Sequence, residues 1–162
     1  MKNILLPTDF SENAFKAMEY AVQLFQHEEC TFHLLHTYTP VSYSLQTLGR
    51  GVTSMVAEEI IRRNSEGGLR EIEDKLKNKF KNPKHTFKTS ASFNLLINEI
   101  IDVVKERDID FIVMGTKGAT GAKEVFLGTN TMYTIKKVNC PVIAVPEAYV
   151  FGELKEILFP TD

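Results

Sequence analysis

Hydrophobic positions along the chain alternate between short apolar runs and stretches in which apolar residues recur every three or four positions. The runs are typical of buried strands and cover residues 1–7, 30–38, 85–90, 108–114 and 142–145. The stretches between them predict helices at 11–25, 54–80, 96–104 and 129–137. Strands that alternate with helices in this way predict an α/β fold in which an open parallel sheet is covered by helices on both faces.

The first two predicted helices carry local signals that affect where they begin and whether they continue. Ser11 is expected to cap the first helix with its hydroxyl, and Glu12 suits the positive end of the helix dipole. Asp9 is the alternative cap. In the second helix, Gly67 and Gly68 are adjacent, and each interior glycine costs about 1 kcal/mol relative to alanine. We therefore expect a kink or a break at this pair.

Composition excludes several classes of protein. The chain has 162 residues, 43% of them hydrophobic, and a formal net charge of -2. This length fits one ordinary domain, and the charge argues against a nucleic-acid partner. The longest apolar runs are far shorter than the roughly 20 residues of a membrane helix, and the N-terminal region lacks the apolar segment of a signal peptide. The expectation is a cytoplasmic protein with no membrane partner.

The cysteines and histidines give no sign of a metal site. Cys30 and Cys140 are far apart in sequence and are expected to be reduced thiols. His33 and His36 lie three apart in a predicted strand, so their side chains should point to opposite faces of the sheet. No metal ligand is therefore predicted in the protein itself.

The segment 111–129 carries the strongest chemical signal. An apolar strand ends at Gly115, and Gly118 and Gly128 follow before a predicted helix that starts at Thr129. Glycines permit close approach of a ligand to the backbone, and exposed amides at a helix N-terminus attract anions. Phosphate is the natural candidate.

A second group of polar residues follows the first strand. Pro7, Thr8 and Asp9 end that strand, and ligands of open parallel sheets bind beyond the carboxyl ends of the strands. If the first and fourth strands are neighbours, a carboxylate and a glycine loop meet in one crevice. Asp9 could then accept hydrogen bonds from a ribose, while the loop amides hold phosphates. Neither GxxxxGK[ST] nor GxGxxG is present in the expected places, which disfavours a Walker-type NTPase and a Rossmann dehydrogenase.

Taken together, these motifs resemble those of the universal stress protein family. The resemblance rests on the first strand ending Pro-Thr-Asp, on HLLHTYTP at 33–40, on VMGTKG at 113–118 with LGT at 127–129, and on CPVIAVP at 140–146. The spacing from Gly115 to Gly118 and on to Gly128-Thr129 is similar to the signature of the ATP-binding branch. The resemblance implies a five-stranded parallel sheet in the order 3-2-1-4-5, with the first and fourth strands side by side.

The resemblance also implies a set of nucleotide-binding residues. Pro7, Thr8 and Asp9 would line the adenosine end, with Asp9 near the ribose, and Thr37 would face the adenine through its backbone. The phosphates would lie against the loop and the following helix. The remaining implied residues are Met114 and Gly115 beside the nucleoside, Gly118, Gly128, Thr129 and Asn130 around the phosphates, and Lys117, which either reaches a phosphate or is solvated. The ligand would be ATP, ADP or AMP, with Mg or Mn carried on the phosphates.

Three classes of function fit these residues. We favour an ATP-binding regulatory module of the stress response, at most a slow ATPase, because the loop offers no general base or arginine finger. A protein-interaction module with a vestigial nucleotide site is the alternative. An adenylyl transferase or a PP-loop ligase is disfavoured, since DFSENAF stands where those enzymes carry HxGH or SGGxDS.

A repeat at the two ends of the sequence bears on domain organisation. MKNILLPTD at 1–9 recurs as LKEILFPTD at 154–162, with six of nine positions identical. Chance similarity between apolar strands is the alternative. We expect a universal stress protein domain at 1–147, a linker at 148–153 and the first strand of a second tandem copy at 154–162. Members of the family commonly pair through the last strand, here 142–145, which implies a homodimer or pairing with a second copy.

Overall fold

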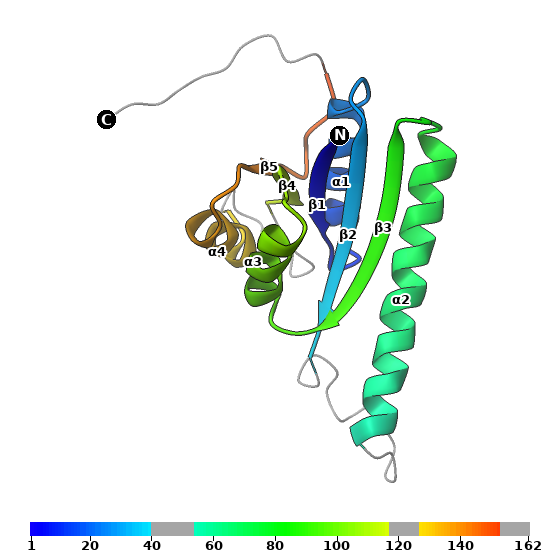
Figure 1. Cartoon of the computed structure of the whole chain (residues 1–162), viewed down its shortest axis with the longest axis vertical. Helices are drawn as coiled ribbons and strands as arrows, with labels where there is room; N and C mark the ends of the chain where they lie inside the picture. Colours follow the sequence, from blue (N-terminus) through cyan, green and yellow to red (C-terminus); the bar gives the residue numbers. More distant parts are fainter. Residues whose placement is uncertain (40–53, 117–126, 153–162) are drawn as a thin grey trace.

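The computed structural model describes residues 1–39, 54–116 and 127–152. Strands and helices alternate along this part of the chain (Figure 1). The elements are β1 (Lys2–Pro7), α1 (Glu12–Leu24), β2 (Cys30–Tyr38), α2 (Ser54–Lys79), β3 (His85–Phe93), α3 (Leu96–Glu106), β4 (Phe111–Gly115), α4 (Thr129–Lys137) and β5 (Val142–Val145). None of the helices in these ranges is long and apolar enough to cross a bilayer.

The five strands form one parallel sheet in the order β3-β2-β1-β4-β5. The predicted fold class and strand order are therefore confirmed. Because β1 pairs with both β2 and β4, Leu5 lies opposite His33 on one side and Ile112 on the other. This order puts the carboxyl ends of β1 and β4 side by side, which is the arrangement that the candidate site requires.

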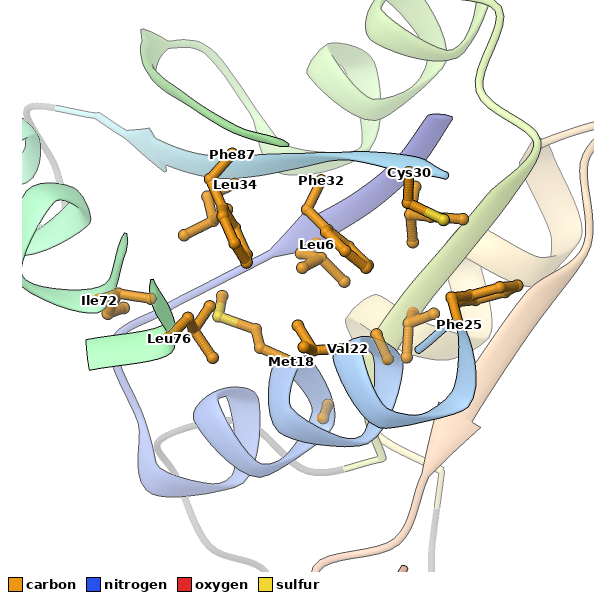
Figure 2. Packing of buried hydrophobic residues seen from close by; sticks show 14 of the residues in the cluster. Leu6, Met18, Val22, Phe25, Cys30, Phe32, Leu34, Ile72, Leu76 and Phe87 are labelled. Carbon is orange, nitrogen blue, oxygen red and sulfur yellow. The ribbon is translucent and has the colours of Figure 1, made fainter. Parts of the chain in front are cut away.

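Alternate residues of each strand contribute to two separate cores, as the period of two in a strand dictates. On one face, Leu6 and Leu34 pack with residues of α1 and α2, such as Met18 and Leu76 (Figure 2). On the other face, Leu5 and Leu35 pack with Ile100 and Val103 of α3. The sheet is thus buried on both sides, which explains why β1 and β4 are continuous apolar runs.

The predicted N-cap of α1 is confirmed. The Ser11 hydroxyl accepts a hydrogen bond from the amide of Ala14 at 3.2 Å. The alternative, Asp9, is not the cap, because its carboxylate accepts instead from the amide of Ser11 at 3.0 Å. Asp9 thereby stabilises the turn that leads into the helix.

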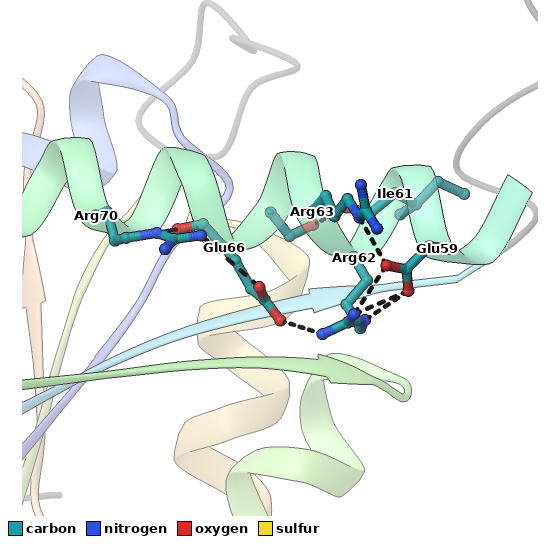
Figure 3. Close-up of polar contacts among 7 residues, drawn as sticks. Glu59, Ile61, Arg62, Arg63, Glu66 and Arg70 are labelled. Carbon is teal, nitrogen blue, oxygen red and sulfur yellow. Dashed lines mark hydrogen bonds and ion pairs between the residues drawn. The ribbon is translucent and has the colours of Figure 1, made fainter. Parts of the chain in front are cut away.

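Of the kink or break predicted at Gly67-Gly68, the break is wrong, because α2 is one uninterrupted helix of 26 residues. Buried apolar side chains follow the glycine pair, Leu69, Ile72 and Leu76 among them. Before and after the pair, Arg62 bridges Glu59 and Glu66, and Arg70 pairs with Glu66 (Figure 3). Packing of the apolar face and pairs three and four residues apart outweigh the intrinsic cost of the glycines.

Two strand boundaries differ from the sequence prediction. β3 continues to Phe93, three residues beyond the predicted end, because all nine of its residues pair with β2. β4 starts at Phe111 rather than at 108, since Asp108 has a φ of 47° in the turn that follows α3. Left-handed backbone of this kind ends regular pairing.

The chain after β5 returns to α1. The ring of Tyr20 makes edge contacts with Tyr149 and Phe151, with centroids 5.0 and 5.8 Å apart. The repeated sequence at 154–162 lies outside the described residues. The domain limits and the second copy therefore stay predictions.

Candidate functional site

A cavity of about 300 Å³ opens beyond the carboxyl ends of β1, β2 and β4. Nine of the eleven predicted site residues line it: Pro7, Thr8, Asp9, Thr37, Met114, Gly115, Gly128, Thr129 and Asn130. The other two, Lys117 and Gly118, lie outside the described residues. We call this cavity the carboxyl-end crevice. Its volume is at the lower end of the range for small-molecule pockets, about 300–1,000 Å³.

The loop after β1 forms one wall of the crevice and is held by its own side chains. The hydroxyl of Thr8, a buried residue, accepts from the amide of Phe10 at 3.0 Å. The carboxylate of Asp9 accepts from the amide of Ser11. The amide of Thr8 donates to the carbonyl of Leu35 in β2. These bonds fix Thr8 and Asp9 at the mouth of the crevice.

The opposite wall is built where β4 ends and α4 begins. The buried hydroxyl of Thr131 donates to the carbonyl of Gly115 at 2.8 Å, which ties the helix to the strand. Gly128 is the N-cap of α4, and no side chain of the described residues caps the helix there. The N-terminal amides and the helix dipole therefore present partial positive charge to the crevice.

Protein packing by itself requires a glycine at position 115. A Cβ atom at this position would lie 2.5 Å from Nδ2 and 2.9 Å from Cγ of Asn13. Asn13 is buried on α1, so it has little room to move. The first glycine of the motif thus lets α1 approach the end of β4.

Histidine 36 contributes to the third side of the crevice, next to Thr37. Its Nδ1 lies 2.8 Å from the carbonyl oxygen of Thr8, and since a carbonyl only accepts, Nδ1 carries the proton. Burial lowers the pKa of His36, while the bond to Thr8 and the charge of Asp9 oppose this shift. The imidazole is therefore neutral at pH 7.

Four lining residues were absent from the sequence prediction: Ala14, His36, Leu96 and Thr131. Thr131 could have been found from the sequence, because it is the third residue of the helix that begins at the motif. Leu96 is the first residue of α3, and it lines the crevice because of how α3 packs on the sheet, which the sequence pattern does not reveal. Among the described residues, no group of three or more His, Cys, Asp or Glu side chains is placed to hold a metal ion.

A second and wider cavity, about 730 Å³, lies at the β3 edge of the sheet, with lining residues from β1, β2, β3 and α2 and from the turn after α3. We call it the β3-edge groove; Asn3, His33, Lys88 and Arg107 are among its lining residues. The Arg107 guanidinium donates to Nδ1 of His33 at 3.3 Å, so Nε2 carries the proton and donates to Asn3 Oδ1 at 3.2 Å. Burial, together with the charges of Arg107 and Lys88, lowers the pKa of His33 to about 4.

The chain belongs to the universal stress protein family, whose sequence model matches residues 1–146. Universal stress protein MJ0577 of Methanocaldococcus jannaschii is 32% identical over 158 residues, covering 89% of this chain and 94% of that protein. The solved structure of MJ0577 superposes with a TM-score of 0.72 at 27% identity, covering 90% of this chain and 95% of that one.

Two further solved structures share the fold and contain nucleotides. A universal stress protein in complex with cAMP has a TM-score of 0.63 at 15% identity and covers 91% of this chain and 98% of its own. A family member from Arabidopsis thaliana with AMP bound has a TM-score of 0.59 at 13% identity, covering 90% and 92%. At these identities the likeness extends to the fold alone.

Proposed function

We propose that this chain binds an adenine nucleotide, with ATP as the favoured ligand, and acts as a regulatory module of the stress response. The observation that carries the proposal is the convergence of nine predicted residues on one crevice, together with a helix N-terminus that no side chain in the described ranges caps. Other members of the family are solved with cAMP or AMP, which supports an adenine nucleotide as the class of ligand.

Each wall of the crevice suits a different part of the nucleotide. The carboxylate of Asp9 can accept hydrogen bonds from the ribose hydroxyls, and Thr37 offers backbone groups to the adenine. Met114 and Gly115 supply apolar contact beside the nucleoside. The start of α4, from Gly128 to Asn130, would hold the phosphates, with Lys117 and Gly118 completing that side.

The same residues argue for slow hydrolysis at most. Asp9 and His36 are the titratable residues among the described lining residues, and no arginine lines the crevice there. Asp9 is assigned to the ribose, and His36 uses its N–H for Thr8. Phosphoryl transfer depends on charge stabilisation at the γ-phosphate, so any catalysis would rest on a Mg or Mn ion bound through the phosphates.

Isothermal titration calorimetry with ATP, ADP and AMP tests the proposal. We expect binding by the unmodified chain and its loss in Gly128→Val, because a branched side chain would obstruct the approach of phosphates to the helix N-terminus. Gly152→Val is the matched control, since nothing lies within 4 Å of a Cβ at Gly152. No heat at millimolar nucleotide would defeat the proposal and favour an interaction module with a vestigial site.

We propose further that copies of this domain pair through β5. In the described sheet β5 lies at an edge and pairs with β4 alone, and Val142, Ile143 and Ala144 are partly exposed. An edge strand of this kind invites pairing with another chain. Light scattering should give the mass of a homodimer, and a monomer at moderate concentration would contradict pairing between copies of this chain.

A further inference from the structure

Phe10, in the loop that forms the Asp9 wall of the crevice, has an unusual backbone conformation. Its φ is 64°, in the left-handed region that bulky side chains rarely adopt. Its amide donates to the Thr8 hydroxyl, so this conformation sets the course of the chain through Thr8 and Asp9. A strained residue persists only where its surroundings hold it.

Helix α2 provides one support for the Phe10 ring. A Cβ atom at Gly68 would lie 2.8 Å from Cε1 and 3.0 Å from Cζ of Phe10, so the ring rests where a side chain would otherwise be. At the adjacent Gly67 a Cβ would have nothing within 4 Å. The two glycines that look alike in sequence therefore differ in what they face.

His36 provides the second support and connects the ring to the crevice. The rings of Phe10 and His36 have centroids 4.3 Å apart and are tilted by 41°. The same imidazole donates from Nδ1 to the carbonyl of Thr8 at 2.8 Å. A continuous series of contacts thus runs from Gly68 through Phe10 and His36 to Thr8.

We infer that Phe10 and His36, seated against Gly68 of α2, are positioning residues that fix the Thr8–Asp9 wall of the nucleotide crevice. This inference rests on the proposed function, and it adds that the placement of a helix outside the crevice controls nucleotide affinity. Gly68 leaves room for the ring, which is 40% exposed and would have to move if an alanine stood there. The helix tolerates the glycine pair because packing elsewhere holds it together.

Gly68→Ala and Gly67→Ala form a matched pair for testing this inference. Both substitutions raise helix propensity equally, but only Gly68→Ala meets the Phe10 ring. We expect Gly68→Ala to weaken ATP binding by about tenfold, which corresponds to 1.4 kcal/mol. Gly67→Ala should leave the affinity unchanged. Equal affinities for the two variants, both folded, would overturn the inference.

A double-mutant cycle with Phe10→Leu separates positioning from general damage. Leucine lacks the outer ring atoms that an alanine at 68 would meet, so Gly68→Ala should cost little further affinity in the Phe10→Leu background. Full additivity of the two losses would contradict the proposed contact. Should Gly68→Ala fail to fold alone, its recovery in this background gives the same answer.

The His36 link is tested by its hydrogen bond. His36→Leu removes the donor to Thr8 and should weaken ATP binding, whereas His36→Asn places an amide N–H near the position of Nδ1 and should restore most of the affinity. If His36 only filled space, the presence of an N–H donor would make no difference to the ATP affinity of the two variants. Equal losses in both variants would remove His36 from the set of positioning residues.

Amide chemical shifts of Thr8 and Asp9 in the nucleotide-free protein test the positioning role without relying on nucleotide binding. Gly68→Ala should shift these resonances, and Gly67→Ala should not. If the unmodified protein binds no nucleotide, the proposed function fails, and the amide shifts still decide whether Gly68 and Phe10 position the loop. Unchanged amide shifts of Thr8 and Asp9 in Gly68→Ala would overturn the inference that Gly68 and Phe10 position the loop.

Discussion

The carboxyl-end crevice and the β3-edge groove differ in size, in charge and in their position relative to the ends of the strands. The groove is the larger, about 730 against 300 Å³, and its lining includes the cations Lys88 and Arg107 as well as the carboxylate of Glu73. The crevice relies instead on backbone amides at the start of α4. Ligands of open parallel sheets bind beyond the carboxyl ends of the strands, so we place the proposed site in the crevice although the groove has more space and, among the described residues, more cationic side chains.

The two cavities also use the two histidines of β2 differently. His33 is locked between Asn3 and Arg107 and is a structural element of the groove. His36 holds the wall of the crevice through Thr8. Their opposite facing was expected from their spacing and is confirmed by their partners. Four experiments test the contrast between the cavities.

Gly115→Ala should have the largest effect, because it forces the crevice wall against α1. A Cβ 2.5 Å from Nδ2 of buried Asn13 has to displace it, and overpacking of this kind costs about 3 kcal/mol. Urea denaturation measures the loss, and ATP binding should weaken in parallel. Gly152→Ala, with open space around its Cβ, is the control. Unchanged stability would mean that Gly115 is needed only for the ligand.

The second largest effect should be a loss of protein stability in acid, caused by His33 in the groove. The pKa of His33 falls from 6.5 to about 4 on folding, so the unfolded chain binds more protons between these values. Stability from this group is complete above pH 6.5 and is lost as the pH falls toward 4. The decrease in unfolding free energy from pH 7 to 5 should be about 2 kcal/mol smaller in His33→Gln than in the unmodified protein.

His36 and His85 have pKa values shifted in the same direction and are present in both proteins, so their contributions cancel in this comparison. Chemical denaturation at several pH values gives the measurement. Parallel pH profiles for the two proteins would show that His33 is not the group that titrates.

Thr131→Val should have an intermediate effect on the crevice. The substitution keeps the shape of the side chain but removes the donor to the Gly115 carbonyl, which costs about 1 kcal/mol. Thr134→Val is the matched control on the same helix, since that hydroxyl donates to the carbonyl of Asn130 one turn earlier. Thr131→Val should have a lower melting temperature and a weaker affinity for ATP than Thr134→Val. The opposite order would contradict a role of Thr131 in holding the crevice wall.

Removing the cations of the groove should have the smallest effect on binding. Lys88 and Arg107 line the groove and not the crevice. Lys88→Gln and Arg107→Gln should therefore each change the ATP dissociation constant by less than about twofold at physiological salt. A loss of ATP affinity as large as that expected for Gly128→Val would indicate that the phosphates bind in the groove rather than in the crevice.

The sequence predicted the crevice better than it predicted the supports around it. The predicted set from Pro7 to Asn130 includes residues far apart in sequence, and nine of them share one cavity. The strand ends and the glycine spacing are visible locally, and the family resemblance supplied the rest of the set; their contacts with a nucleotide stay a prediction. His36 and Leu96 were missed because they reach the crevice only through the packing of β2 and α3.

The sequence by itself determined the order of strands and helices, the cap at Ser11 and the α/β class, because these follow from local periodicity and local hydrogen bonding. The strand order came from the family resemblance. Only the tertiary structure decided that α2 continues through Gly67-Gly68 and that Phe10 occupies the space beside Gly68. The reason is physical: the consequence of a glycine depends on which atoms lie opposite it, and those atoms come from distant parts of the chain.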